Sequence, residues 1–89
     1  MSKKVCLIIG GGRGMGAATA RQMHSRDYAL ALMSPTESCE TLATELGGIA
    51  QRGRAESASD LNSVFDLTME KYGRIERWSR NFGPFVKVD

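Results

Sequence analysis

The sequence predicts an α/β fold, in which a parallel sheet has helices on both faces. Three observations lead to this prediction. Apolar segments of strand length alternate with segments of helical periodicity, the first strand is apolar throughout, and a glycine-rich turn joins it to the first helix. Strands that alternate with helices are joined by right-handed crossovers, and such strands run parallel.

The first strand is the continuous apolar run Val5-Cys6-Leu7-Ile8-Ile9, which Gly10 ends. A run of this kind is typical of a strand that is buried on both faces of a parallel sheet. Helical periodicity follows from Gly14 to about Arg26, with three alanines and with Met23 one turn beyond the last of them. Because its side chains are small, this helix can lie close to the sheet.

The second strand is the apolar run from Tyr28 to Met33, and Ser34-Pro35 closes it because proline cannot donate to a ladder. A second helix follows, with one apolar stripe and a glycine pair, Gly47-Gly48, as its stop. The stripe has the spacing i, i+3, i+4 and i+7, and consists of Cys39, Leu42, Ala43 and Leu46.

A short, weakly apolar segment from Ile49 to Gly53 is expected to be the third strand. The third helix begins after Ser57, which forms a capping-box pattern with Asp60, and it ends at Gly73. A fourth strand is expected from Arg74 to Arg80, although its charged residues are unusual for a strand. The last residues have no clear period and are expected to be extended or loose.

Composition narrows the class of protein. The net charge of +2 comes from interspersed residues, so we expect no nucleic-acid or membrane partner. The amino-terminal apolar run is far too short to be a secretory or membrane segment, which indicates a cytoplasmic protein. Cys6 and Cys39 have no metal-ligand spacing and are expected to be buried thiols, and the single histidine, His24, is expected at the surface.

The glycine-rich turn is Gly10-Gly11-Gly12-Arg13-Gly14-Met15-Gly16. Between a strand and a helix, it can offer unpaired backbone N–H groups to a phosphate, and glycine lets the phosphate approach closely. The turn fits G-x-G-x-x-A from Gly12 and G-x-x-x-G-x-G from Gly10; we favour the second. A mononucleotide loop would need a lysine and a Ser or Thr, which are missing, whereas a ligand-free turn remains an alternative.

In the second register the segment Ile9 to Gly16 resembles the T-G-x-x-x-G-x-G loop of the short-chain dehydrogenase/reductase family, with Ile9 in place of the threonine. The resemblance continues through Leu61 to Ile75, over roughly the first three quarters of the chain. It implies a truncated Rossmann-like sheet of about four strands in the order 3-2-1-4. Residues 1–80 would be a dinucleotide-binding half-domain and residues 81–89 a loose tail.

The resemblance also implies a cofactor. At the end of the second strand, where an NAD-selective site has Asp or Glu, the chain has Ser34, and Arg13 could contact a 2′-phosphate. We therefore expect NADP, with NAD as the alternative. The expected cofactor-binding residues are Gly10, Gly12, Arg13, Gly14, Met15, Gly16, Ser34 and Asn81.

The chain departs from the family where catalysis is concerned. Arg54 stands where an aspartate commonly contacts adenine, and neither Tyr28 nor Tyr72 has the lysine four residues later that lowers a phenol pKa. The resemblance thus implies the NAD(P)(H)-binding portion of an oxidoreductase that does not catalyse alone. The alternative is a non-enzymatic, oligomerising interaction module or a truncated remnant on the same fold.

An uncovered sheet edge is expected beyond the fourth strand, because the family's further strands and helices do not follow in this sequence. Exposed edges and apolar surface are seldom left without a partner. We therefore expect a homo-oligomer that forms through this edge or through a swapped tail.

Overall fold

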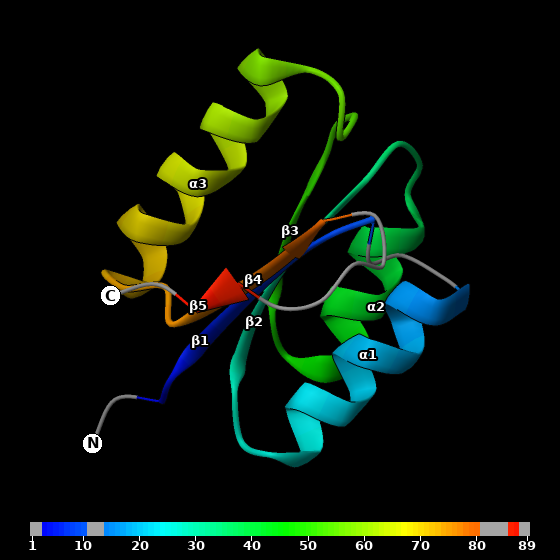
Figure 1. The fold of residues 1–89 in the computed structure, drawn as a ribbon. Helices are drawn as coiled ribbons and strands as arrows, with labels where there is room; N and C mark the ends of the chain where they lie inside the picture. The colour runs from blue at the N-terminus through cyan, green and yellow to red at the C-terminus, as the bar shows by residue number, and fades with distance from the viewer. Residues whose placement is uncertain (1–2, 11–13, 81–85, 88–89) are drawn as a thin grey trace.

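A computed structural model describes residues 3–10, 14–80 and 86–87. A sheet lies in the middle of the molecule, with α1 and α2 on one side and α3 on the other (Figure 1). The strands are ordered β3-β2-β1-β4-β5. The first four are parallel, and β5 is antiparallel to β4. The predicted parallel order 3-2-1-4, with helices on both faces, is confirmed.

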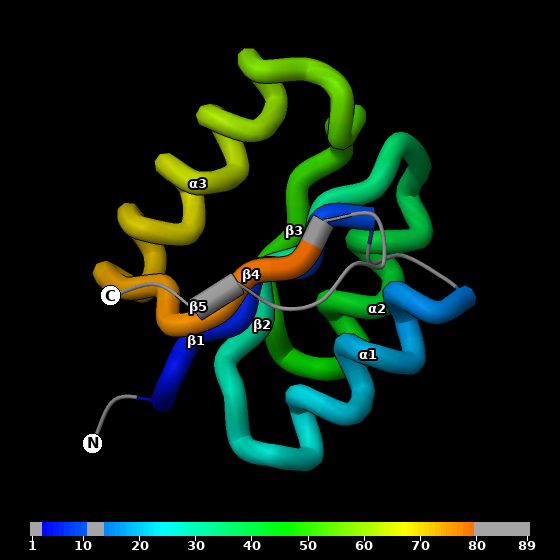
Figure 2. The backbone as a smooth tube through the Cα atoms, viewed as in Figure 1, coloured from blue at the N-terminus to red at the C-terminus, as the bar shows by residue number. Residues whose placement is uncertain are grey.

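The two central strands, β1 (Val5–Ile9) and β2 (Ala29–Ser34), make the sheet's buried centre. Every residue of β1 is buried, as the continuous apolar run predicts. β3 (Ile49–Arg52) pairs with β2, and β4 (Arg77–Arg80) pairs with β1. In the tube drawing of Figure 2 the chain passes from α3 back to the sheet, where it forms β4 beside β1.

Alternation along the strands divides the core in two. Cys6, Ile8, Leu30 and Leu32 pack with residues of α1 (Gly14–Ser25) and α2 (Ser38–Leu46). Leu7, Ile9, Ala31 and Met33 pack with residues of α3 (Ala58–Tyr72). Each predicted helix therefore uses its apolar stripe against one face of the sheet.

The predicted helix stops are present. Gly47 and Gly73 end α2 and α3 with φ of 74° and 75°, a left-handed conformation that glycine adopts without steric cost. At the start of α3, Ser57 Oγ accepts from the Asp60 N–H at 3.2 Å. The other half of the capping box differs from the prediction, because the Asp60 carboxylate accepts from the Arg54 N–H at 2.9 Å instead.

The carboxyl-terminal part of the sheet differs from the sequence prediction. β4 begins at Arg77, three residues later than expected, and Val86–Lys87 form β5. The expectation of an unpaired β4 edge is therefore wrong at two positions, where Arg77 pairs with Lys87 and Trp78 with Val86. The physical reason is that an edge offers backbone donors and acceptors to any extended segment, and side-chain patterns do not report such pairing.

Candidate functional site

The candidate site begins where β1 ends. The N–H of Gly10 donates to the Met33 carbonyl at 2.6 Å, so Gly10 still belongs to the parallel ladder between β1 and β2. Its φ of 91° is a conformation that favours glycine. The turn toward α1 is thus fixed at the carboxyl ends of the two central strands, where ligands bind in open α/β sheets.

Gly14 begins α1 and is exposed, with a φ of 63°. A Cβ added to Gly14 would meet no heavy atom within 4 Å, so the backbone here is open to an incoming group. The first turn of α1 carries no acidic residue. Unpaired N–H groups and the positive end of the helix dipole favour an anion at such a position, and the residues present therefore fit a pyrophosphate.

Four of the predicted cofactor residues lie together at this junction. Gly10 ends the strand, and Gly14, Met15 and Gly16 form the start of α1. Gly16 is buried, whereas 70% of the Met15 surface is exposed. Three other predicted residues, Gly12, Arg13 and Asn81, lie outside the described residues.

Ser34 lies at the end of β2, as expected, but its hydroxyl is engaged within the chain. It donates to the Thr36 carbonyl at 2.9 Å and accepts from the Cys39 N–H at 3.2 Å. Ser34 is 5% exposed and stabilises the first turn of α2. Two hydroxyls that the sequence reasoning missed, Thr36 and Ser38, lie 3.0 Å apart just beyond it. The segment Ser34-Pro35-Thr36-Glu37-Ser38, with three hydroxyl residues directly after a strand, could have indicated them.

A cavity of about 450 Å³ runs between α1 and α2 and connects Gly14 with Ser38. Arg21 of α1 and Glu45 of α2 line it and form an ion pair, and the hydrogen bond from Arg21 lowers the pKa of Glu45. Glu37 also lines the cavity, so a carboxylate lies beside the hydroxyls. The remaining lining residues are Ala17, Thr41 and Leu42.

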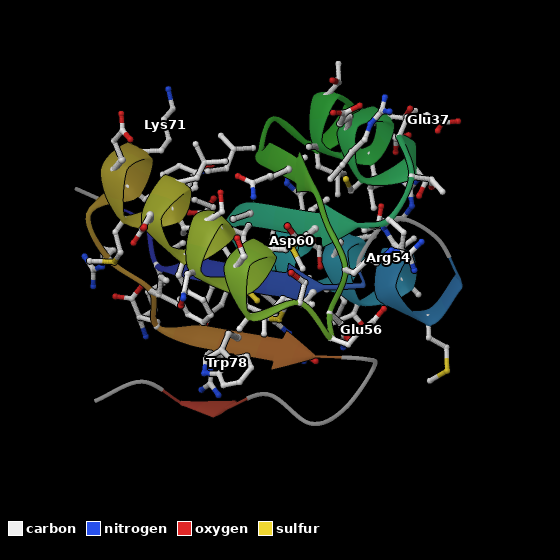
Figure 3. The ribbon with its side chains drawn as sticks, turned by 90° about the horizontal axis from the view of Figure 1, so that it is seen from above. Glu37, Arg54, Glu56, Asp60, Lys71 and Trp78 are labelled. Atoms are coloured by element: carbon white, nitrogen blue, oxygen red, sulfur yellow. The ribbon has the colours of Figure 1, made fainter. Side chains whose placement is uncertain are left out.

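The turn after β3 completes this edge of the sheet. Arg54 forms an ion pair with Glu56 at 3.7 Å, and 70% of its side chain is exposed. Figure 3 shows Arg54 and Glu37 toward the same end of the molecule, with Lys71 toward the other. Arg52, the last residue of β3, pairs with Glu40 at 2.9 Å. This part of the molecule therefore presents hydroxyls, the carboxylate group of Glu37 and two arginines that are paired with glutamates, and no aspartate stands at the position of Arg54.

The tyrosines have structural contacts. The Tyr72 hydroxyl donates to the Leu30 carbonyl at 3.1 Å, and burial raises the pKa of this phenol. The Tyr28 hydroxyl accepts from Arg77 Nε at 3.1 Å. A phenol with a raised pKa is a less efficient acid/base catalyst at neutral pH.

The cysteines are free and buried, as predicted, and burial raises the pKa of the Cys6 thiol to about 12. A thiol in this state is a poor nucleophile. In the part of the chain that the structure describes, no His, Cys, Asp and Glu residues form a group able to hold a metal ion. Over the same residues, no helix is both long and apolar enough to cross a bilayer.

Known proteins are similar to this chain in sequence and in fold. The rat 3-oxoacyl-[acyl-carrier-protein] reductase is 40% identical over 72 residues, which are 78% of this chain and 30% of that protein. Tropinone reductase-like 1 of Erythroxylum coca is 32% identical over 83 residues, 90% of this chain and 30% of that protein. The chain thus spans about 30% of the length of these relatives. No protein-family model matches the chain.

A short-chain dehydrogenase/reductase from Brucella melitensis superposes with a TM-score of 0.79 at 25% identity, over 88% of this chain and 37% of that one. The Ser34 position and the β1–α1 junction described above thus lie in a fold that this family shares. In sequence and in fold, the chain therefore resembles a segment of a short-chain dehydrogenase/reductase.

Proposed function

We propose that the chain is the dinucleotide-binding portion of an NADP(H)-dependent short-chain oxidoreductase of the cytoplasm. The observation that carries this proposal is the open backbone of Gly14 at the amino terminus of α1, beside the carboxyl ends of β1 and β2. In this arrangement the pyrophosphate of the cofactor would lie against the first turn of α1.

The relatives support the chemistry of the proposal. The rat relative is named as a reductase. A 3-ketoacyl-(acyl-carrier-protein) reductase from Brucella melitensis, solved as a complex with NADH, superposes on the chain with a TM-score of 0.81 at 20% identity. The superposition covers 86% of this chain and 33% of the Brucella reductase.

The preference for NADP is supported by the end of β2. No carboxylate occupies the Ser34 position, where it would repel a 2′-phosphate. Because the Ser34 proton is directed to the Thr36 carbonyl, we infer that Thr36, Ser38 and the predicted Arg13 contact the phosphate. The Glu37 carboxylate beside them opposes this preference, so Glu37→Gln should increase the affinity for NADPH over NADH.

Hydride transfer is not expected from this chain alone. The family's proton-donating tyrosine and the lysine four residues later have no counterpart in the sequence, and both tyrosines bond elsewhere. Binding without turnover is therefore the expected behaviour, and a cofactor-binding assay is the appropriate test.

The test is a calorimetric titration with NADPH and NADH, in the chain itself and in Gly14→Val. We expect saturable binding of NADPH below millimolar concentration, and its loss in Gly14→Val, because the added side chain would occupy the phosphate position. Gly47→Val is the matched control. Gly47 also has a positive φ, 74°, and open space around it, but it lies at the end of α2.

The control separates loss of binding from loss of folding, because both variants force a β-branched residue into a left-handed conformation. The alanine variants at the same two glycines repeat the comparison with less strain. Absence of saturation in the unmodified, folded chain would contradict the proposal, as would equal affinities for NADPH in the Gly14 and Gly47 variants.

We also propose that the chain self-associates through its sheet edges. Among the described residues, β3 has no partner strand on its outer side, and β5 covers β4 at two positions only. Unpaired strand edges favour association between copies. Sedimentation at micromolar concentration is expected to give a dimer or larger species, and a monomer would contradict this proposal.

A further inference from the structure

A further cavity lies at the end of the molecule away from the candidate dinucleotide site, near the start of β2. It measures about 300 Å³, which is at the lower end of the ~300–1,000 Å³ range of small-molecule pockets. Its lining residues come from α1, from the turn between α1 and β2, and from β4: Gln22, Met23, Arg26, Tyr28 and Arg77. In Figure 1 the end of α1 and the start of β2 lie at the bottom, away from the turn that follows β1.

Arg77 is an unusual residue for its place in the sheet. It pairs in register with Cys6, whose side chain belongs to the core beneath α1 and α2. Residues in register on neighbouring strands share a face, so the guanidinium lies on the α1 side, and its Nε donates to the Tyr28 hydroxyl at 3.1 Å. This bond fixes the guanidinium while its two terminal nitrogens form no hydrogen bond with any residue that the structure describes.

The surrounding charges are already paired elsewhere. Asp27 forms an ion pair with Lys3 at 3.3 Å, and Glu76 bonds to Arg74 and to the Val5 N–H. Within residues 3–10, 14–80 and 86–87, no carboxylate pairs with Arg26 or Arg77, and none lines the cavity. Arg26 and Arg77 therefore line one small cavity without a counter-charge from these residues.

The carboxyl end of α1 would ordinarily repel an anion. Here its last carbonyls have donors: Gln22 O accepts from the Arg26 N–H, Met23 O from the Tyr28 N–H, and His24 O from the Asp27 N–H, at 2.9 to 3.2 Å. The repulsion is thereby reduced, and Arg26 adds a positive charge at the same end.

We propose that this cavity, between Arg26 and Arg77, binds a phosphate group, either as inorganic phosphate or on a small phosphate ester. Guanidinium groups match the geometry of phosphate oxygens and keep their charge at any physiological pH. The phenol of Tyr28 positions Arg77, and the Gln22 amide can donate to a further oxygen. The site is separate from the proposed dinucleotide site and does not depend on it.

The test is a titration of the isotopically labelled chain, followed by amide chemical shifts, with inorganic phosphate, glycerol 3-phosphate and acetate as probes. We expect saturable shifts at Gln22, Arg26, Tyr28 and Arg77, with acetate at least about tenfold weaker than phosphate because it carries a single charge. A phosphate ester that binds more tightly than inorganic phosphate would identify the ester as the preferred ligand.

The variants are Arg77→Gln and Arg26→Gln, with Arg54→Gln as the control that removes the same group at the opposite edge. Each of the first two should weaken phosphate binding at least about tenfold, and the control should leave it unchanged. Arg26 is exposed, so its substitution tests the site even if the Arg77 variant fails to fold. NADPH binding should be unaffected in Arg26→Gln, and phosphate binding should persist in Gly14→Val.

Three outcomes would overturn the proposal. Shifts that rise linearly without saturation, or equally in all three variants, would mean unspecific screening of surface charge. Equal affinities for acetate and phosphate would exclude a phosphate site. Shifts confined to Gly14, Met15 and Gly16 would place the phosphate at the start of α1 instead.

Discussion

The two central strands, β1 and β2, are held in the sheet by buried apolar side chains, whereas β4 is held by contacts of individual side chains. β1 is apolar at every position, and β2 is buried from Leu30 to Ser34. β4 instead has the sequence Arg77-Trp78-Ser79-Arg80, and its described side chains find individual partners. Arg77 bonds to Tyr28, while the Trp78 ring packs edge-on against Phe65 with ring centroids 5.8 Å apart.

This difference shows where specific contacts replace hydrophobic periodicity. A central strand needs apolar side chains on both faces, and apolar side chains of similar volume can replace one another there. β4 lies next to the short edge strand β5, so polar groups can reach solvent or a neighbouring hydroxyl. Stability should therefore depend on bulk burial in β1 and β2, and on pairwise contacts around β4.

The largest expected effect is in the central strands. Leu32 is fully buried, and Leu32→Ala should destabilise the chain by about 2–5 kcal/mol, because apolar contact is lost and a cavity remains. Trp78 is half-buried, and Trp78→Leu should cost less, about 1–2.5 kcal/mol, because the aromatic pair contributes ~0.5–1.5 kcal/mol and part of the apolar burial is lost as well. Urea unfolding of both variants measures the contrast, and equal losses would contradict it.

A smaller effect is expected where β3 approaches β2. A Cβ at Gly48 would lie 2.7 Å from the Leu30 carbonyl oxygen, a backbone atom that cannot rotate away. Gly48→Ala should therefore destabilise the chain by about 1–3 kcal/mol, as overpacking does. The neighbouring Gly47 has open space, so Gly47→Ala should cost about 1–2 kcal/mol from its left-handed backbone alone.

The Gly48 and Gly47 variants should differ in the amide signals that they shift as well as in their loss of stability. The Gly48 change should shift the amide signals of β2 around Leu30, whereas the Gly47 change should affect only the end of α2. Unchanged β2 signals in a folded Gly48→Ala chain would mean that the close approach is absent in solution.

The smallest expected effect concerns acid stability near β4. Burial raises the pKa of Glu76, but hydrogen bonds from the Val5 N–H and Arg74 outweigh burial and leave this pKa below its ordinary value. A lowered carboxyl pKa contributes stability above the pKa of the unfolded chain, and this stability is lost as the pH falls through the folded-state pKa. Glu76→Gln should therefore lose less stability than the parent between about pH 7 and pH 3.

The exposed Glu70 provides the control for this prediction. Glu70→Gln should follow the parent's pH dependence when the free energy of unfolding is measured by urea at each pH. If Glu76→Gln follows the same curve as the parent, the contact with Val5 contributes nothing to acid stability.

Much of the fold was predictable because local physics fixes it. The short, β-branched run Val5 to Ile9, which Gly10 ends, is typical of a buried strand, and the glycines after α2 and α3 adopt the left-handed conformation that their positions required. The position of Gly14 at the start of α1 was also predictable, since a strand, a glycine turn and a small-residue helix follow in order. The order of these segments along the sequence does not predict which backbone groups form hydrogen bonds with residues far away in the sequence.

The sequence by itself thus determined the parallel α/β order and the place of the glycine turn, because both follow from periodicity and backbone freedom over a few residues. Only the tertiary structure decided that Ser34 bonds inward to Thr36 and Cys39, that Arg77 meets Tyr28, and that Val86–Lys87 extend the sheet. These contacts join groups by geometry across separate elements. The free energy of such contacts depends on distance in space, which no local pattern encodes.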